Sequence, residues 1–289
     1  MMVFNPSLIN GFADLAPRYD ALLCDVWGVV HNGVTAFPTA GAALAQFRRG
    51  GGTVVLISNA PRPGAGVIKS LDRLGVIREA YDDIVTSGDL TQSHVASHPG
   101  QAVFHIGPDR DLGIFDGLDV RFGPIEAADY AICSGLFDDE RETPEHYRGL
   151  LARMHRRALF MLCANPDLVV ERGDRLVYCA GAIADLYTKL GGEVLYAGKP
   201  HPPIYEAALA KVAARRGAPV PLPRVLAIGD SVRTDLAGAT QAGIDSLFVT
   251  GGIHAEELGE RHDPDLGALA RIFAEARLVP TAVTQRLAW

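Results

Sequence analysis

The chain has 289 residues, more than one average domain needs, so a core with an inserted or appended domain is expected. Its composition, 48% hydrophobic and 21% charged, is that of an ordinary globular protein. The formal net charge of −7 argues against nucleic-acid and anionic-membrane partners, because both require clustered Lys and Arg side chains.

Targeting signals are not visible in the sequence. Residues 1–20 contain neither the basic nor the apolar segment of a secretory signal. No apolar run reaches the roughly 18 residues that a membrane-spanning helix needs. The cysteines lie in apolar stretches and form no Cys-x-x-Cys pair, which is typical of reduced, buried thiols. We therefore expect a cytoplasmic protein without a membrane partner.

Apolar runs of strand length alternate with helix-length segments in the first and last parts of the chain. The expected strands cover residues 21–26, 53–57, 193–196, 224–228 and 246–249. Helical segments are expected over 64–74 and from about Pro203 and Asp235. This alternation predicts right-handed βαβ units, and nearly continuous apolar strands indicate a sheet covered on both faces. The fold class that follows is α/β, with a doubly wound, Rossmann-like parallel sheet.

The middle of the chain has its own short apolar runs, at 102–106, 120–122, 130–133 and 159–163. A helix is expected to begin at Thr143, because Pro144 suits a first helical position and Glu145 a first turn. We therefore divide the chain into a core of residues 1–88 and 191–289 and an inserted smaller α/β domain of residues 89–190. The tail from Pro280 is too weakly patterned to assign.

A carboxylate stands at the end of the first expected strand. Asp25 is followed by Trp27 and Gly28, and the carboxyl ends of parallel strands are where open α/β sheets bind ligands. Gly28 allows a sharp turn and a close approach of the backbone to a ligand. An aspartate that caps a turn is the alternative, and this segment alone does not decide between the two.

The strand at 53–57 ends in Ser58 and Asn59, whose donors suit a phosphate, although an ordinary cap explains them equally well. Lys199, between a strand and a helix, can supply positive charge to a dianionic substrate. A solvated surface lysine is the common alternative, but the flanking Gly198 and Pro200 fix the backbone and favour a functional role.

The sharpest feature follows the strand at 224–228. Asp230 and Asp235 lie five positions apart, after a buried strand and before a helix, and such hard oxygen ligands suit Mg²⁺. A turn cap and a helix-dipole carboxylate are the alternative roles. The metal interpretation is favoured because this strand must point to the same sheet edge as Asp25.

Together these segments resemble the four motifs of the haloacid-dehalogenase-like superfamily, over nearly the whole chain. Asp25 matches the nucleophile of the first motif, and Ser58 matches the hydroxyl residue of the second. Lys199 matches the lysine of the third motif, and Asp230 with Asp235 matches the acidic pair of the fourth. An insert between Ser58 and Lys199 resembles a class II cap, and the segment 163–167 with Gly198-Lys199-Pro200 resembles the class IIA branch. The resemblance implies a phosphatase of a small phosphorylated metabolite, with a homodimer possible.

The resemblance also implies a mechanism. The Asp25 carboxylate, the Trp27 carbonyl and the Asp230 carboxylate would hold Mg²⁺, and Asp25 would form an aspartyl-phosphate. Ser58, the Asn59 amide and Lys199 would hold the phosphoryl oxygens, and Asp235 would orient Lys199 or a metal-bound water. On the cap, Asn165 and Asp167 are candidates for substrate contact, although Asn-Pro-Asp also favours a plain turn.

One position departs from the family pattern. Trp27 stands where these phosphatases carry a second Asp as general acid and base, and an indole cannot transfer a proton at neutral pH. His31 is a possible substitute acid, although a role in stabilising the loop is the more common one.

Because of Trp27, an alternative function stays open: the protein would be a catalytically weak homologue that binds a phosphate ligand or regulates another process. A metal-free dehalogenase is disfavoured, because Asp230 and Asp235 would repel Asp25 without a cation.

Overall fold

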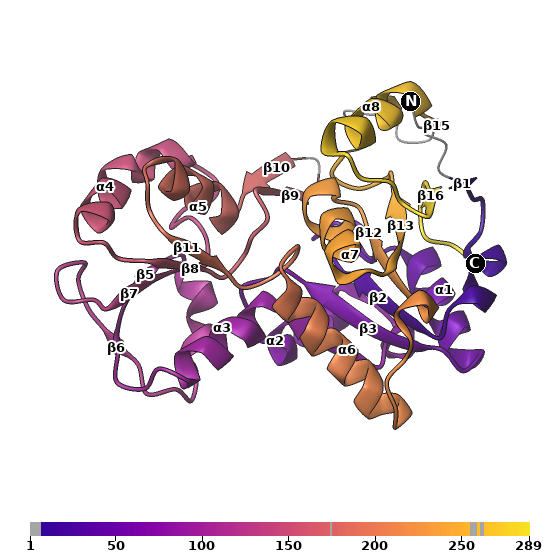
Figure 1. Ribbon diagram of the computed structural model, residues 1–289, viewed down its shortest axis with the longest axis horizontal. Coiled ribbons are helices and arrows are strands. Elements are labelled where there is room, and N and C mark those ends of the chain that lie inside the picture. The colour runs from indigo at the N-terminus through magenta and orange to yellow at the C-terminus, as the bar shows by residue number, and fades with distance from the viewer. Residues whose placement is uncertain (1–6, 174, 255–258, 261–262) are drawn as a thin grey trace.

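The structure is a computed structural model that describes residues 7–173, 175–254, 259–260 and 263–289. A larger and a smaller parallel sheet organise the chain, and in Figure 1 the part built around the smaller sheet lies to the left. Within the described residues, no helix is both long and apolar enough to cross a lipid bilayer.

The larger sheet has the strand order β1-β16-β13-β12-β2-β3-β4, and its neighbouring strands run parallel. Its strands are β1 (Ser7–Leu8), β2 (Ala21–Asp25), β3 (Thr53–Ser58), β4 (Asp83–Thr86), β12 (Val225–Gly229), β13 (Asp245–Val249) and β16 (Ala282–Thr284). Every residue of β2, β3 and β12 is buried, as the continuous apolar runs predict for strands covered on both faces.

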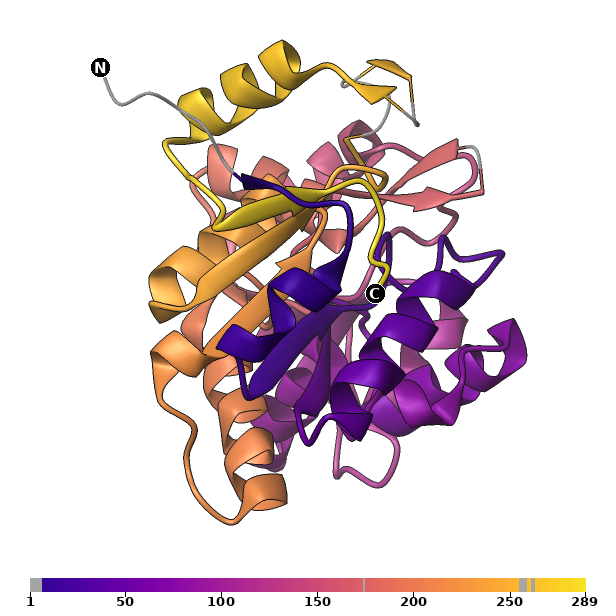
Figure 2. The same ribbon diagram turned by 90° about the vertical axis from the view of Figure 1, so that its right-hand side faces the viewer.

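Helices cover both faces of this sheet, which confirms the doubly wound α/β fold. They are α1 (Pro38–Arg49), α2 (Gly64–Leu74), α6 (Pro202–Arg216), α7 (Ala237–Ala242) and α8 (Leu266–Ala276). Leu44 of α1 and Leu71 of α2 join the core on one face, and Ile204 of α6 joins the core on the other. Figure 2 shows α1 and α2 (purple) and α6 and α7 (orange) on opposite sides of the sheet.

The smaller sheet has the order β11-β8-β7-β5-β6 and is also parallel. Its strands are β5 (Ala102–Ile106), β6 (Arg121–Phe122), β7 (Tyr130–Cys133), β8 (Met161–Cys163) and β11 (Val194–Tyr196). The helices α4 (Arg148–Arg156) and α5 (Ala180–Lys189) pack on one face, and α3 (Ser87–Ala96) reaches the other through Val95. We call this sheet, with its helices and the segments that connect them, the cap.

Two antiparallel hairpins complete the fold. β9 (Val169–Arg172) pairs with β10 (Arg175–Tyr178), and β14 (Gly259–Glu260) pairs with β15 (Asp263–Pro264). The first hairpin follows β8 of the cap along the chain and extends toward the larger sheet (Figure 1).

Several elements differ from their sequence-based expectations. The strand expected at 193–196 is β11 and pairs with β8 in the cap sheet, because three half-exposed residues carry no signal for their partner. The unassigned tail forms β16, between β1 and β13. Helix α3 spans the position 88/89 at which the sequence analysis divides the chain.

Two helix starts also differ. Thr143 caps a short 3₁₀ turn, Pro144–Tyr147, and α4 begins only at Arg148. The helix expected from about Asp235 begins as a π-helical turn, Val232–Leu236, which leads into α7. The N-cap signal at Thr143 is therefore real, but the first turn is wound more tightly than an α-helix.

Candidate active site

The carboxyl ends of three neighbouring strands build the site. Asp25 ends β2, Ser58 ends β3, and Asp230 directly follows β12. β2 lies between β3 and β12, and the chain crosses to opposite sides of β2 to form them. This is the switch point at which open α/β sheets bind ligands, so the fold places these side chains at a binding crevice.

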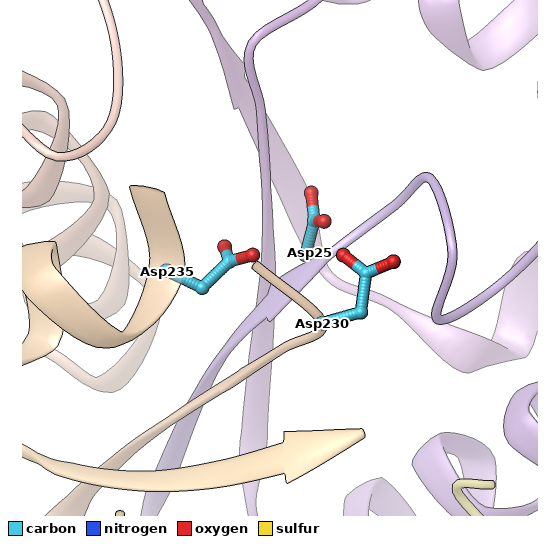
Figure 3. A group of neighbouring side chains, drawn as sticks. All are labelled: Asp25, Asp230 and Asp235. Carbon is cyan, nitrogen blue, oxygen red and sulfur yellow. The ribbon is translucent and has the colours of Figure 1, made fainter. Parts of the chain in front are cut away.

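Three buried carboxylates meet at this edge (Figure 3). One oxygen each from Asp25, Asp230 and Asp235 lies within 4.8 Å of the others. Asp25 extends from β2, and Asp230 and Asp235 lie in the segment between β12 and α7. The distance is short enough for the oxygens to share one cation, and hard oxygen ligands are those that Mg²⁺ prefers.

Asp230 is held by backbone on two sides. Its Oδ2 accepts a hydrogen bond from the Ile253 amide at 2.9 Å. A Cβ on Gly28, which has φ +82°, would lie 1.9 Å from that oxygen, and a Cβ on Gly252 would lie 1.8 Å from it. Gly28 is therefore required for the close approach of the loop after β2 to Asp230, whereas the sequence suggests an approach to the ligand.

Lys199 is buried against this cluster. Its Nζ lies 2.6 Å from Oδ1 of Asp25 and 2.6 Å from Oδ1 of Asp235. The Ser231 amide donates to the other Asp235 oxygen at 3.1 Å, so Asp235 is fixed by both contacts. The lysine thus bridges the end of β2 and the turn before α7.

Asn59 holds the lysine in place. Its Oδ1 accepts from the Lys199 amide at 2.7 Å, and its Nδ2 donates to the Lys199 carbonyl at 3.2 Å. The same Nδ2 donates to Asp167 of the cap at 2.9 Å. The sequence predicts Asn59 as a donor to a phosphate but not as a partner of Lys199, because a side-chain link to a residue 140 positions away leaves no local signal.

Burial and charge shift the pKa values of these groups. Burial raises the pKa of Asp25 well above its ordinary value, with a further rise from the Asp235 carboxylate. Burial likewise raises the pKa of Asp230 to about 8, again with a contribution from Asp235. Burial lowers the pKa of Lys199, but Asp235 and Asp25 outweigh this and the net pKa is well above its ordinary value. The lysine is therefore protonated, and the raised pKa values of the two carboxyl groups reflect their crowding, which a shared divalent cation would relieve.

A pocket of about 110 Å³ opens between this edge and the cap. Asp25, Trp27, Ser58 and Asn59 line it from the core. From the cap come Arg110, Asp111, Ser134, Asp139, Asn165, Asp167 and Arg172, with others. The other residues suggested by the sequence do not line this pocket: Gly28, His31, Lys199, Asp230 and Asp235.

Trp27 and His31 organise the loop after β2. The Gly28 amide donates to the His31 carbonyl at 2.7 Å, and the Gly33 amide donates to Nδ1 of His31 at 2.8 Å. Burial lowers the pKa of His31 to about 4, with a smaller effect from Arg62, so the ring is neutral near pH 7. These contacts favour the loop-stabilising role of His31 over the role of a substitute acid.

The sequence and the fold both match known families and solved structures. Residues 22–121 match the family model described as haloacid dehalogenase-like hydrolase, and residues 196–275 match a second model described as HAD-hydrolase-like. A crystal structure of a haloacid dehalogenase-like hydrolase from Brucella suis is 48% identical, with a TM-score of 0.87, covering 97% of this chain and all of that one.

Curated relatives include two named phosphatases. The D-glycerol 3-phosphate phosphatase of Mycobacterium tuberculosis is 28% identical over 83% of this chain, and the match spans 65% of that protein. The ribonucleotide monophosphatase NagD of Escherichia coli is 25% identical over 80% of this chain and 88% of that protein. The chain therefore belongs to the haloacid dehalogenase-like hydrolases, in their class IIA branch.

Proposed function

We propose that the protein is a Mg²⁺-dependent phosphohydrolase that cleaves a small phosphomonoester through an aspartyl-phosphate on Asp25. The observation that carries the proposal is the contact of one buried ammonium, that of Lys199, with both Asp25 and Asp235 beside Asp230. A nucleophile, a positive charge and a cation site are thus next to one another, which are the parts that phosphoryl transfer needs.

The donor set fits a hard divalent cation. The carboxylates of Asp25 and Asp230, with the Trp27 carbonyl, would hold Mg²⁺, and the crowding of carboxyl groups that raises the pKa of Asp230 supports this choice. When bound, the ion supplies charge neutralisation to the phosphoryl oxygens.

The residues of the chain then have distinct roles. An Asp25 oxygen forms a bond to phosphorus in line with the ester P–O bond, which breaks, and the leaving oxygen takes a proton from solvent. Lys199, the Ser58 hydroxyl and the Asn59 amide hold the phosphoryl oxygens as charge develops on them. Asp235 orients Lys199, which it contacts at 2.6 Å. Water then cleaves the aspartyl-phosphate, and inorganic phosphate and free Asp25 result.

The cap excludes water and selects the leaving group in this proposal. Asn165 is its candidate for substrate contact, because it is buried and lines the pocket that contains Asp25. The substrate is a small phosphorylated metabolite of the kind named for the relatives, such as glycerol 3-phosphate or a ribonucleotide monophosphate.

Trp27 supports a second candidate function, a phosphate-binding or regulatory protein with little turnover. It lines the pocket where an acid would face the leaving group, and general acid–base catalysis contributes roughly 10² to 10⁴-fold. Such a protein would retain metal and phosphate binding but release phosphate from no ester.

A phosphate-release screen of phosphate esters and an acyl phosphate, with Mg²⁺ and with a chelator, decides between the two. We expect Mg²⁺-dependent turnover in the wild type, a loss on the order of 10⁴-fold or more in Asp25→Asn, and unchanged folding by circular dichroism. A phosphorylated peptide containing Asp25, trapped at low pH and detected by mass spectrometry, would support the covalent step. Full activity in Asp25→Asn contradicts the proposal, and binding without turnover favours the second candidate.

A further inference from the structure

A second pocket lies beside the active-site pocket and is unusually rich in arginine. It has a volume of about 400 Å³, and Arg62, Arg73 and Arg172 line it together with His31, Ser58 and Ser70. Among the described residues that line it there is no carboxylate. Clustered guanidinium groups without acidic neighbours in the wall create a positive potential, which suits an anionic ligand.

The two pockets share a wall. Trp27, Ser58, Ala60, Arg62 and Arg172 line both of them. Ser58 is also the last residue of β3, beside Asp25 at the end of β2. A ligand with its phosphoryl group at Asp25 can therefore extend past Ser58 toward the arginines without leaving the protein surface.

The side chain of Arg62 differs from its neighbours in its lack of hydrogen bonds among the described residues. In the described part of the chain its guanidinium forms no hydrogen bond or ion pair, and its Nε is buried without an acceptor. Burial lowers the pKa of Arg62, with an opposing effect from Asp111, which forms no salt bridge with it. A partly buried charge without a partner is costly, and an anionic ligand would offset that cost.

The neighbouring arginines are engaged differently. Arg172 donates to both oxygens of Asp139, at 3.2 and 2.7 Å, and Arg110 shares that carboxylate at 2.6 Å. Within the described residues, the Arg73 guanidinium donates only to the Ser70 hydroxyl and the Lys69 carbonyl. Arg62 is thus the group with its full donor capacity left for a ligand, and Arg172 and Arg73 add charge around it.

The backbone of Arg62 is fixed even though its side chain is unpaired. Its carbonyl accepts from the Thr86 hydroxyl at 2.7 Å. A Cβ on Gly88, in the first turn of α3, would lie 2.2 to 2.5 Å from the Arg62 backbone, so the two segments are packed closely. A substitution of the side chain therefore leaves these backbone contacts in place.

We propose that Arg62, assisted by Arg73 and Arg172, binds a second anionic group on the leaving-group portion of the substrate. The preferred substrates are then phosphomonoesters that carry a carboxylate or a second phosphate, because the planar guanidinium fork matches both anions. This inference rests on the proposed function, since it takes the scissile phosphoryl group to lie at Asp25.

Three esters of one chain length test the inference: 3-hydroxypropyl phosphate, 3-phosphonooxypropanoate and 1,3-propanediol bisphosphate. The measured quantity is the ratio of kcat/KM for each charged ester to kcat/KM for the neutral ester. We expect a ratio of at least 10 in the wild type, a fall of at least tenfold in Arg62→Gln, and partial recovery in Arg62→Lys. The two charged esters distinguish a carboxylate from a phosphate as the natural group.

Arg121→Gln is the matched control, because Arg121 is an exposed cap arginine whose guanidinium donates to the Gly100 carbonyl. Its ratio should equal that of the wild type. A wild-type ratio near 1, or a ratio that Arg62→Gln does not change, overturns the inference while the phosphatase function stands.

Binding gives a readout that does not depend on turnover. Calorimetry with Mg²⁺ compares 3-phosphonopropanoate with 3-hydroxypropylphosphonate, which cannot be hydrolysed. We expect the wild type to prefer the carboxylated phosphonate at least tenfold and Arg62→Gln to lose that preference. If this preference is present but no ester is hydrolysed, the proposed function fails and the anion site stands. If the wild type does not prefer the carboxylated phosphonate, the proposal of an anion site is wrong.

Discussion

The indole Nε1 of Trp27 donates a hydrogen bond to the backbone carbonyl of Glu171, in the β9–β10 hairpin of the cap. The indole also packs on Gly33, where an added Cβ would lie 2.4 Å from the ring. Trp27 therefore joins the loop after β2 to the cap. This contact gives Trp27 a structural role that proton transfer does not require.

Trp27→Phe should loosen the hairpin without removing the aromatic ring. The N–H donor is lost, so we expect faster amide exchange over residues 169–178 and a several-fold higher KM. Hydrogen–deuterium exchange and steady-state kinetics measure the two effects. Unchanged exchange in the hairpin would show that the Trp27–Glu171 contact does not hold the cap.

Trp27→Asp should add the missing acid while also losing the indole contact, so Trp27→Phe is its control. With alkyl phosphates, whose leaving groups need a proton, we expect Trp27→Asp to exceed Trp27→Phe by roughly 10²-fold in kcat. With 4-nitrophenyl phosphate, a good leaving group, the two should be similar. Equal rates on alkyl phosphates would refute the explanation based on a missing acid.

Lys199→Met should destabilise the metal-free protein strongly. The ammonium is buried and bridges Asp25 and Asp235, so its removal leaves two buried carboxylates without their cation. We expect a loss of about 3 to 5 kcal/mol in the free energy of unfolding, measured in urea with a chelator. Lys211→Met is the matched control, because the Lys211–Asp83 pair is partly exposed and should contribute at most about 1 kcal/mol.

Asp230→Asn should separate metal binding from folding. Removal of one of the clustered carboxylates relieves repulsion, so the metal-free variant should melt at or above the wild-type temperature. Mg²⁺ at about 100 times its Kd should stabilise the wild type by about 2.7 kcal/mol and the variant far less. Differential scanning fluorimetry measures both, with the exposed Asp116→Asn as control. A wild-type melting temperature that Mg²⁺ does not move argues against the metal site.

His105 should make stability depend on pH below neutrality. Burial lowers its pKa to about 4 in the folded cap, where Nε2 lies 2.9 Å from the Ser134 hydroxyl. The unfolded chain has a pKa of about 6.5, so it binds the proton first as pH falls. The contribution of neutral His105 to the free energy of unfolding is thus fully present above pH 6.5, and up to about 3 kcal/mol of it is lost by pH 4. Urea unfolding from pH 4 to 7 should show a shallower dependence in His105→Gln than in the exposed control His155→Gln.

Residues that end buried strands could be placed from the sequence. Asp25, Ser58 and Asp230 each close an apolar run, and parallel strands bring their carboxyl ends to one edge, so their meeting follows from local pattern and topology. Asp235 follows from its spacing to Asp230 across one turn. The doubly wound core is predictable for the same reason.

Contacts between the core and the cap could not be placed in this way. The Trp27–Glu171 and Asn59–Asp167 bonds join residues 144 and 108 positions apart, and no local pattern specifies how the cap sits on the core. The unpaired state of Arg62 depends on that same arrangement. Strand β11 was placed in the wrong sheet because its three residues would suit either one.

That placement of β11 matters for Lys199. The strand ends at Tyr196, so only two residues separate a strand of the cap from the lysine that contacts Asp25. Lys199 itself is held to the core, because Asn59 bonds both its amide and its carbonyl. On this side the cap is therefore joined to the anchored lysine through Ala197 and Gly198 alone, and we expect a tilt of the cap to be absorbed at these two residues while the ammonium keeps its contacts with the carboxylates.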